Sequence, residues 1–231
     1  APPPTHHHPD DTAMDFDFLI VLAQWPMLLY GLWLTALLTL VSAVFGTALG
    51  IACAWARIEG PAPVRALVGF YVELIRNTPF IIQLFFVFFG LPSLGVRLSP
   101  MTASMLAMLL NLGGYSCEII RSGIEATPRG LVEAAQSLAL NRWQIFTRVV
   151  LPPALARIWP AQVSQIIIVM LGSAVCSQIS TEEFSQAINL VSSRTYRTFE
   201  AYMLAGVVYL ALAIAMRALL NWAGRRLIFR R

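Results

Sequence analysis

The sequence predicts an all-α integral membrane protein with about five transmembrane helices. Of its 231 residues, 58% are hydrophobic and only 12% are charged, which is roughly half the charged fraction of a typical soluble domain. Five apolar segments are each long enough to cross roughly 30 Å of hydrocarbon. Arginines gather between alternate segments, as expected for loops on one side of a membrane.

The expected spans follow one another along the chain at residues 27–55, 64–90, 100–120, 154–179 and 202–222. Residues 16–25 form an amphipathic, acidic segment that is expected at the membrane interface. The three histidines all lie in the proline-rich residues 1–13, which we expect to be disordered or non-native, with Met14 as the true start.

Arginine placement predicts the orientation of the chain. With the N-terminus outside, eleven of the sixteen basic residues fall on the inner side and three on the outer side. This bias follows the positive-inside rule, so the N-terminus is expected in the periplasm and the C-terminus in the cytoplasm. The same bias explains the net charge of +4 better than nucleic-acid binding does.

The second span contains a predicted break. Glu73 and Arg76 are three residues apart and can pair on one helical face. Asn77, Thr78 and Pro79 then indicate a helix stop and restart, in which Thr78 caps the new helix and Pro79 occupies its first turn. The break either lines a cavity or is a kink that serves only helix packing.

Polar residues inside the third and fourth spans are the candidates for a solute path. Glu118 and Arg121 repeat the three-residue charge pairing, while Gly113 and Gly114 are expected to permit close helix contact. Polar groups at membrane depth are functional candidates. The candidate path residues are Asn77, Thr78, Asn111, Gln165, Ser173 and Gln178. Their amides and hydroxyls, with a half-helix N-terminus, could hold a solute carboxylate.

Two connecting segments have amphipathic patterns. Residues 181–190 can form a short helix in an outer loop, which is either solvated or a docking surface. Residues 133–153 form two short helices separated at Asn141, and Pro152 and Pro153 are expected to end the second. The second segment lies on the inner side. A passive loop or a DNA-binding helix-turn-helix explains it less well, because spans flank it and an apolar face would stay exposed.

Several chemistries are excluded by residue type. All sixteen basic residues are arginines, so the sequence holds no P-loop lysine and no Schiff-base lysine. The isolated Cys53, Cys117 and Cys176 fit no metal motif. We therefore expect no catalytic residue, no metal site and no cofactor, which disfavours an intramembrane enzyme.

Several motifs together resemble the permease subunits of ABC importers. "EAA" at 133–135, "LAL" at 138–140 and "VVLPPA" at 149–154 are similar to the EAA loop of these proteins. "YVELIRNTPFIIQLFFVFFGLP", "EIIRSGI" and "FEAYMLAGVVYLALA" resemble the polar amino acid branch, of histidine/arginine type. The resemblance extends from about Tyr30 onward and implies the type I importer fold.

The resemblance also implies roles for individual residues. Glu133, Ala134 and Ala135 match the signature triplet, and Leu151 and Pro152 match its end. The family's glycine falls at Ala139, where alanine disfavours a turn that requires positive φ. The ATPase-coupling residues implied are Glu133, Ala134, Ala135, Leu138, Ala139, Trp143, Phe146, Leu151 and Pro152.

The domain division implied is an N-terminal extension at 1–26, a type I permease domain at 27–224 with a coupling segment at 124–153, and a basic cytoplasmic tail at 225–231. The partners implied are a second permease subunit (identical or different), two ATPase subunits, a periplasmic solute-binding protein and the lipid bilayer.

The expected function is ATP-driven import of polar amino acids across the bacterial inner membrane, with ATP hydrolysed by the partner. The alternatives are the same permease class carrying another small solute, such as an opine, or an ATP-independent channel or transporter.

Overall fold

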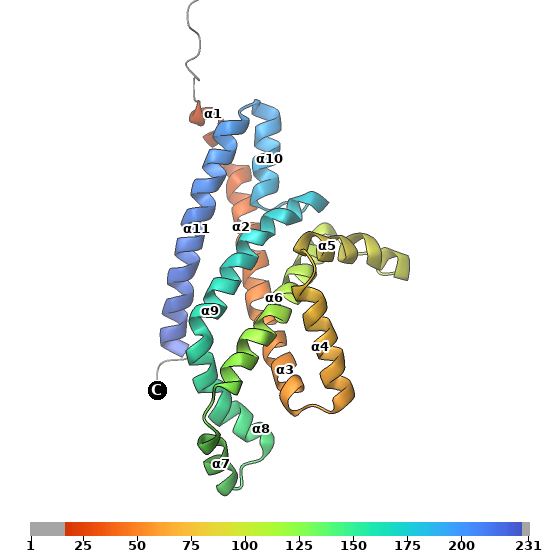
Figure 1. Ribbon diagram of the computed structural model, residues 1–231. Coiled ribbons are helices and arrows are strands. Elements are labelled where there is room, and N and C mark those ends of the chain that lie inside the picture. Colours follow the sequence, from red (N-terminus) through yellow and green to blue (C-terminus); the bar gives the residue numbers. More distant parts are fainter. Residues whose placement is uncertain (1–16, 228–231) are drawn as a thin grey trace, which may run out of the picture.

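The computed structural model describes residues 17–227, and every regular element in that range is a helix (Figure 1). The expectations for residues 1–13, for a start at Met14 and for the end of the basic tail at 228–231 lie outside the described residues. The all-α membrane fold that composition predicted is confirmed.

Four helical segments are long and apolar enough to cross a membrane. The first, Trp25–Glu59, joins α2 (Trp25–Val41), a π-helical turn (Ser42–Gly46) and α3 (Thr47–Glu59). The second is α6 (Pro100–Glu125) and the last is α11 (Thr198–Leu227). The remaining segment, Arg142–Ile179, contains α8 (Arg142–Gln144), the π-helical Ile145–Val150, α9 (Leu151–Gly172) and the 3₁₀-helical Ser173–Ile179.

A fifth candidate crossing consists of two helices with a sharp bend between them. α4 (Ala62–Arg76) meets the segment Phe80–Leu94 at 115°, and the pair is apolar enough to count as one broken span. The segment begins with α5 (Phe80–Phe85) and continues as π-helical Phe86–Gly90 and 3₁₀-helical Leu91–Leu94. In Figure 1, α4 rises toward α5, which turns away sideways. The break predicted at Asn77–Pro79, which divides this segment into two helices, is confirmed.

α6 is the centre of the bundle, and its small residues allow the other helices to approach closely. It packs against α3, α4 and α9. A Cβ on Gly113 would lie 2.7 Å from Leu49 Cδ2, and one on Gly114 would lie 2.7 Å from Ile75 Cγ2. Both distances are below normal carbon–carbon contact, so the packing role expected for these two glycines is confirmed.

A polar contact also joins the three central helices. Gln162 of α9 is 1% exposed, and its Nε2 donates to Thr47 Oγ1 of α3 at 3.0 Å and to Ser116 Oγ of α6 at 2.8 Å. Because few other partners exist in an apolar interior, hydrogen bonds of this kind fix the relative register of membrane helices.

The two ends of the bundle carry different short helices (Figure 1). One end holds α7 (Arg129–Ser137) and α8, and is called the α7–α8 end below. The opposite end, the α10 end, holds α1 (Phe18–Leu22) and α10 (Phe184–Thr195). The helix expected at 181–190 thus begins three residues later, because Glu183 caps it: its Oε1 accepts from Gln186 N at 2.9 Å.

Candidate functional site

The segment between α6 and α9 forms a bracket of two short helices. α7 ends in a Schellman motif, in which Ala139 N donates to Gln136 O at 2.9 Å and Leu140 N to Ala135 O at 3.4 Å. Ala139 has φ +55°. From the sequence, alanine was expected to disfavour a left-handed turn at this position. Ala139 nevertheless adopts the left-handed conformation, because the two hydrogen bonds of the motif close the turn. Such a conformation costs an alanine about 1 kcal/mol relative to glycine.

The second helix of the bracket starts with a capping box. Gln144 N donates to Asn141 Oδ1 at 2.9 Å, and Asn141 N donates to Gln144 Oε1 at 3.0 Å. These reciprocal bonds satisfy two donors at the start of the helix. Asn141 thus separates the two helices, as predicted.

Pro152 and Pro153 do not end this helix, contrary to the sequence prediction. The helix runs without interruption from Arg142 to Ile179, which is 38 residues. The turn before the prolines is π-helical, and Leu151 N donates to Phe146 O, five residues back. The π-helical turn before the prolines interrupts the four-residue bonding pattern in which their missing N–H groups would be needed. The bracket is therefore joined to α9 by continuous helix.

The residues implied as coupling residues divide between two faces of the bracket. Ala135 and Phe146 are 4% and 5% exposed and pack against the ends of α3, α6 and α9. Leu138 and Trp143 are 75% and 57% exposed. The other members of the set are exposed or half-buried: Glu133, Ala134, Ala139, Leu151 and Pro152. The bracket thus presents an uncovered apolar surface at the α7–α8 end.

A cleft of about 500 Å³ lies beneath the bracket. Its lining includes Glu133 and Arg129 of α7, Arg142 of α8 and Glu59 of α3. Arg142 Nη1 contacts Glu59 Oε2 at 3.2 Å, which connects the bracket to the first span. The cleft is lined in part by charged residues, and the bracket above it carries the exposed Leu138 and Trp143. The α7–α8 end therefore offers a partner a concave charged surface next to exposed apolar side chains.

Two of the expected path residues meet at a cavity within the spans. Asn111 of α6 and Gln165 of α9 line a cavity of about 360 Å³, together with Phe80 at the start of α5 and Tyr115 of α6. All of its lining residues are uncharged: Phe80, Asn111, Tyr115, Gln165, Ile168, Val169, Gly172 and Val175. The structure therefore brings the helix break and the two amides together.

The remaining expected path residues lie elsewhere. Ser173 is fully buried and does not line the cavity, because eight residues of about 100° each place it about 80° around the helix from Gln165. Gln178 is exposed and outside the cavity. Asn77 Nδ2 donates to Glu73 O at 2.9 Å, and Thr78 Oγ1 donates to Leu74 O at 2.7 Å.

Asn77 and Thr78 therefore close the end of α4. The prediction that Thr78 caps the following helix was wrong: Pro79 is the N-cap residue and no side chain caps α5. The Thr78 hydroxyl instead donates to the carbonyl of the residue four positions earlier, a common local bond of threonine.

Gln83 is the polar residue of this region that the sequence reasoning missed. Its side chain joins the end of α4 to Asn111 of α6 through four hydrogen bonds. A signal for it existed, because Gln83 is the sole amide in the apolar run from Phe80 to Gly90 and polar residues inside spans are functional candidates.

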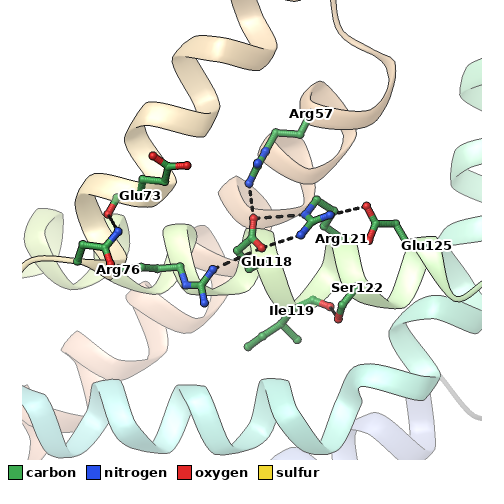
Figure 2. A network of polar contacts seen from close by, with 9 residues as sticks. Arg57, Glu73, Arg76, Glu118, Ile119, Arg121, Ser122 and Glu125 are labelled. Carbon is green, nitrogen blue, oxygen red and sulfur yellow. Dashed lines mark hydrogen bonds and ion pairs between the residues drawn. The ribbon is translucent and has the colours of Figure 1, made fainter.

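An ion network surrounds Glu118 (Figure 2). The carboxylate of Glu118 contacts Arg57 of α3, Arg121 of its own helix at 2.9 Å and Arg76 of α4 at 3.4 Å. Arg121 also contacts Glu125. The expected pairing of Glu118 with Arg121 is confirmed. The network also includes arginines of α3 and α4, which spacing within one helix could not predict.

The expected pair between Glu73 and Arg76 is not formed. Arg76 reaches across to Glu118, and Glu73 makes no ion pair within residues 17–227. Figure 2 shows the Glu73 carboxylate pointing away from the network. Glu118 is 18% exposed and Glu73 is exposed, so Arg76 gains more from the less hydrated carboxylate.

A second buried carboxylate lies at the α10 end. Glu183 is fully buried, and besides capping α10 it accepts from Tyr209 of α11 at 2.9 Å and from Thr35 of α2 at 3.4 Å. Burial raises the pKa of Glu183 above its ordinary value, and the hydrogen bonds oppose that shift. This carboxyl group therefore joins three helices at one end of the bundle.

Comparison with known proteins agrees with this geometry. The family described as "Binding-protein-dependent transport system inner membrane component" matches residues 46–229. The arginine transport system permease protein ArtQ of Bacillus subtilis (strain 168) is 33% identical, over 88% of this chain and 93% of that protein. The L-cystine transport system permease protein TcyB of the same organism is 30% identical, over 94% and 92%.

A solved structure has the same fold. The crystal structure of an amino acid ABC transporter with histidines contains a chain that is 31% identical, with a TM-score of 0.82, over 93% of this chain and 100% of that one. The chain thus belongs to the binding-protein-dependent transport system inner membrane components. It is a permease subunit of an ABC importer, has the type I permease fold, and is not an enzyme; the ATPase of such systems is a separate subunit.

Proposed function

We propose that this permease carries a polar amino acid across the bacterial inner membrane, driven by an ATPase that binds the bracket. One observation carries the proposal: a single continuous helix, Arg142–Ile179, bears both the exposed Trp143 at the bracket and Gln165 in the cavity. A movement imposed on the bracket is thereby transmitted to the cavity wall. The relatives named for arginine and cystine transport support the substrate class.

The proposed domain division keeps residues 27–224 as the permease domain, 124–153 as the coupling segment, 1–26 as the extension and 225–231 as the tail. The proposed assembly contains two permease chains, identical or different, two ATPase subunits and a solute-binding protein. The α7–α8 end faces the cytoplasm and receives the ATPase, while the α10 end and the N-terminus face the periplasm.

The coupling role is tested by charge reversal. Glu133→Lys should leave the chain inserted in the membrane but abolish uptake and co-purification of the ATPase, because it reverses the charge in the cleft beneath the bracket. Glu182→Lys, exposed at the opposite end, should still co-purify the ATPase. If Glu133→Lys bound its ATPase and transported normally, the coupling role would be refuted.

The cavity is tested by removing its amides. Asn111→Leu and Gln165→Leu should lower substrate-stimulated ATPase activity and uptake at least tenfold, because each loses a hydrogen bond to a charged solute. Unchanged uptake in both variants would place the solute path elsewhere. Uptake insensitive to vanadate would favour the channel or transporter alternative, and uptake of an opine but no amino acid would favour the other-solute alternative.

The orientation is tested with single reporter cysteines. Ser193 in α10 and Ser137 in α7 are exposed, whereas all three native cysteines are buried. A membrane-impermeant maleimide applied to spheroplasts should label Ser193→Cys and should label Ser137→Cys only after lysis. The reverse pattern would refute the proposed orientation.

A further inference from the structure

The amide of Gln83 has one orientation, and the helix break determines it. In an unbroken helix the carbonyl of Ile75 would accept from the residue four positions later, which is Pro79 and has no N–H. Gln83 Nε2 supplies the missing donor: it lies 2.8 Å from Ile75 O and 3.0 Å from Thr78 O. Backbone carbonyls can only accept, so the nitrogen of the amide must face them.

The orientation of Gln83 determines that of Asn111. With Nε2 at the break, Oε1 of Gln83 points to α6, where it lies 2.9 Å from Asn111 Nδ2. An amide oxygen can only accept, so the nitrogen of Asn111 must face Gln83. The carbonyl oxygen of Asn111 is then directed away from Gln83, and within residues 17–227 it accepts no hydrogen bond.

Asn111 is 8% exposed, and it lines the same cavity as Gln165. The cavity therefore receives an acceptor from Asn111. Two aromatic rings, Phe80 and Tyr115, also line it. A carbonyl acceptor beside two aromatic side chains, with no cationic residue in the lining, can receive an alkylammonium cation.

We infer that Gln83 is a positioning residue that directs the Asn111 carbonyl into the cavity, and that this carbonyl binds the ammonium group of the amino acid. This assignment rests on the proposed function and, for Asn111, reverses the chemistry expected from the sequence, in which its amide was among the groups that could hold the carboxylate. Gln165, whose side chain makes no hydrogen bond within the described residues, is left for the carboxylate end.

The test compares ligands that lack one charge each. The full chain is purified in lipid nanodiscs with its accompanying subunits, and equilibrium binding is measured for L-glutamine and L-arginine, their methyl esters and their N-acetyl derivatives. The methyl ester keeps the ammonium group, whereas N-acetylation removes it. The wild type should bind the N-acetyl derivative at least tenfold more weakly than the methyl ester.

Gln83→Met keeps the length of the side chain but removes both the donor and the acceptor. It should weaken binding of the methyl ester about tenfold and leave binding of the N-acetyl derivative nearly unchanged. The variant should then no longer discriminate between the two ligands. Gln83→Glu retains an acceptor for Asn111 and, in its protonated form, one donor for the carbonyls at the break, so it should retain the discrimination; it serves if Gln83→Met does not fold. Gln24→Met, the same change at the far end of α2, should bind as the wild type.

A double variant separates positioning from structural support. If Gln83 acts through Asn111, Gln83→Met with Asn111→Leu should bind as weakly as Asn111→Leu alone. Additive losses, or full discrimination in Gln83→Met, would overturn the role of Gln83. Loss of discrimination in Gln83→Glu would also overturn it.

The other outcomes concern the ligand and the site. If the wild type bound the N-acetyl derivatives more tightly than the methyl esters, the ammonium assignment would be overturned, but the cavity would remain the binding site. Normal binding by Asn111→Leu, or no binding of either amino acid by the wild type, would instead overturn the proposed function.

Discussion

Glu118 and Glu183 are carboxylates held inside the same bundle, and the protein stabilises them in opposite ways. Glu118 lies toward the α7–α8 end, where arginines from three helices contact it. Glu183 lies at the α10 end, where the bonds that it accepts within residues 17–227 come from neutral groups. One site compensates a charge with charges, and the other surrounds a carboxyl group with dipoles.

The difference has a physical consequence for each end. A carboxylate between arginines is costly to remove, because the cations remain without a counter-charge. A buried carboxyl group is costly to ionise, and the neutral donors around Glu183 reduce that cost without removing it, so its pKa stays raised. The α7–α8 end is therefore held by charge pairing, whereas stability at the α10 end depends on pH.

The largest expected effect comes from removing the charge at the first site. Glu118→Ala should lower the free energy of unfolding by about 3 kcal/mol, because three arginines lose their common partner. Thermal unfolding of the purified complex measures the change. Glu125→Ala, whose side chain is 57% exposed, is the matched control and should change stability little. Equal effects of the two substitutions would contradict the comparison.

The second effect is a pH dependence at Glu183. Because burial raises its pKa above 4.5, the stabilisation from this group is fully present below the ordinary glutamate value and is lost as pH rises through the raised value. Wild type should therefore lose stability relative to Glu183→Gln as pH increases from 4.5 toward neutral. Melting temperatures of both proteins across this range measure it.

The exposed Glu182→Gln is the control for that series and should show no such trend. A difference between wild type and Glu183→Gln that stays constant with pH would mean that Glu183 does not titrate over this range.

A smaller effect, which stabilises the protein, is expected at the turn after α7. Ala139→Gly should raise the free energy of unfolding by about 1 kcal/mol, since glycine adopts positive φ without a Cβ penalty. Ala134→Gly, in the helical part of α7, should lower it by a similar amount. Chemical denaturation can measure both, and a destabilising Ala139→Gly would show that the turn does not strain the alanine.

The smallest effect is expected at an ion pair whose arginine is largely solvated. Arg142 contacts Glu59 at 3.2 Å, but its side chain is 84% exposed. Arg142→Ala should change stability by less than about 0.5 kcal/mol. A loss comparable to that of Glu118→Ala would show that pairing, and not burial, determines the energy of these contacts.

The sequence predicted those features that depend on local pattern. Long apolar runs located the spans, and Asn77-Thr78-Pro79 located the break, because proline and its neighbours limit the backbone directly. The i,i+3 spacing also predicted the contact between Glu118 and Arg121. In each case the physical cause acts within a few residues.

The features that escaped prediction depend on contacts between helices. Spacing within one helix offered Arg76 the partner Glu73, whereas tertiary packing gives it Glu118. Ser173 was placed in the path because it is polar, but the rotation of its helix turns it away. Pro152 and Pro153 were expected to end a helix, because the π-helical turn that accommodates them is not visible in the sequence.

The uninterrupted helix through Pro152 and Pro153 determines how far a small rotation can reach. Between Leu151 and Gln165, α9 rises by 14 residues at 1.5 Å each, about 21 Å. A tilt of about 5° at the bracket end of this stretch displaces Gln165 by about 2 Å, more than the rise of one residue. A loop at the prolines would absorb such a tilt, whereas the continuous helical backbone carries it from Trp143 to the cavity wall at Gln165.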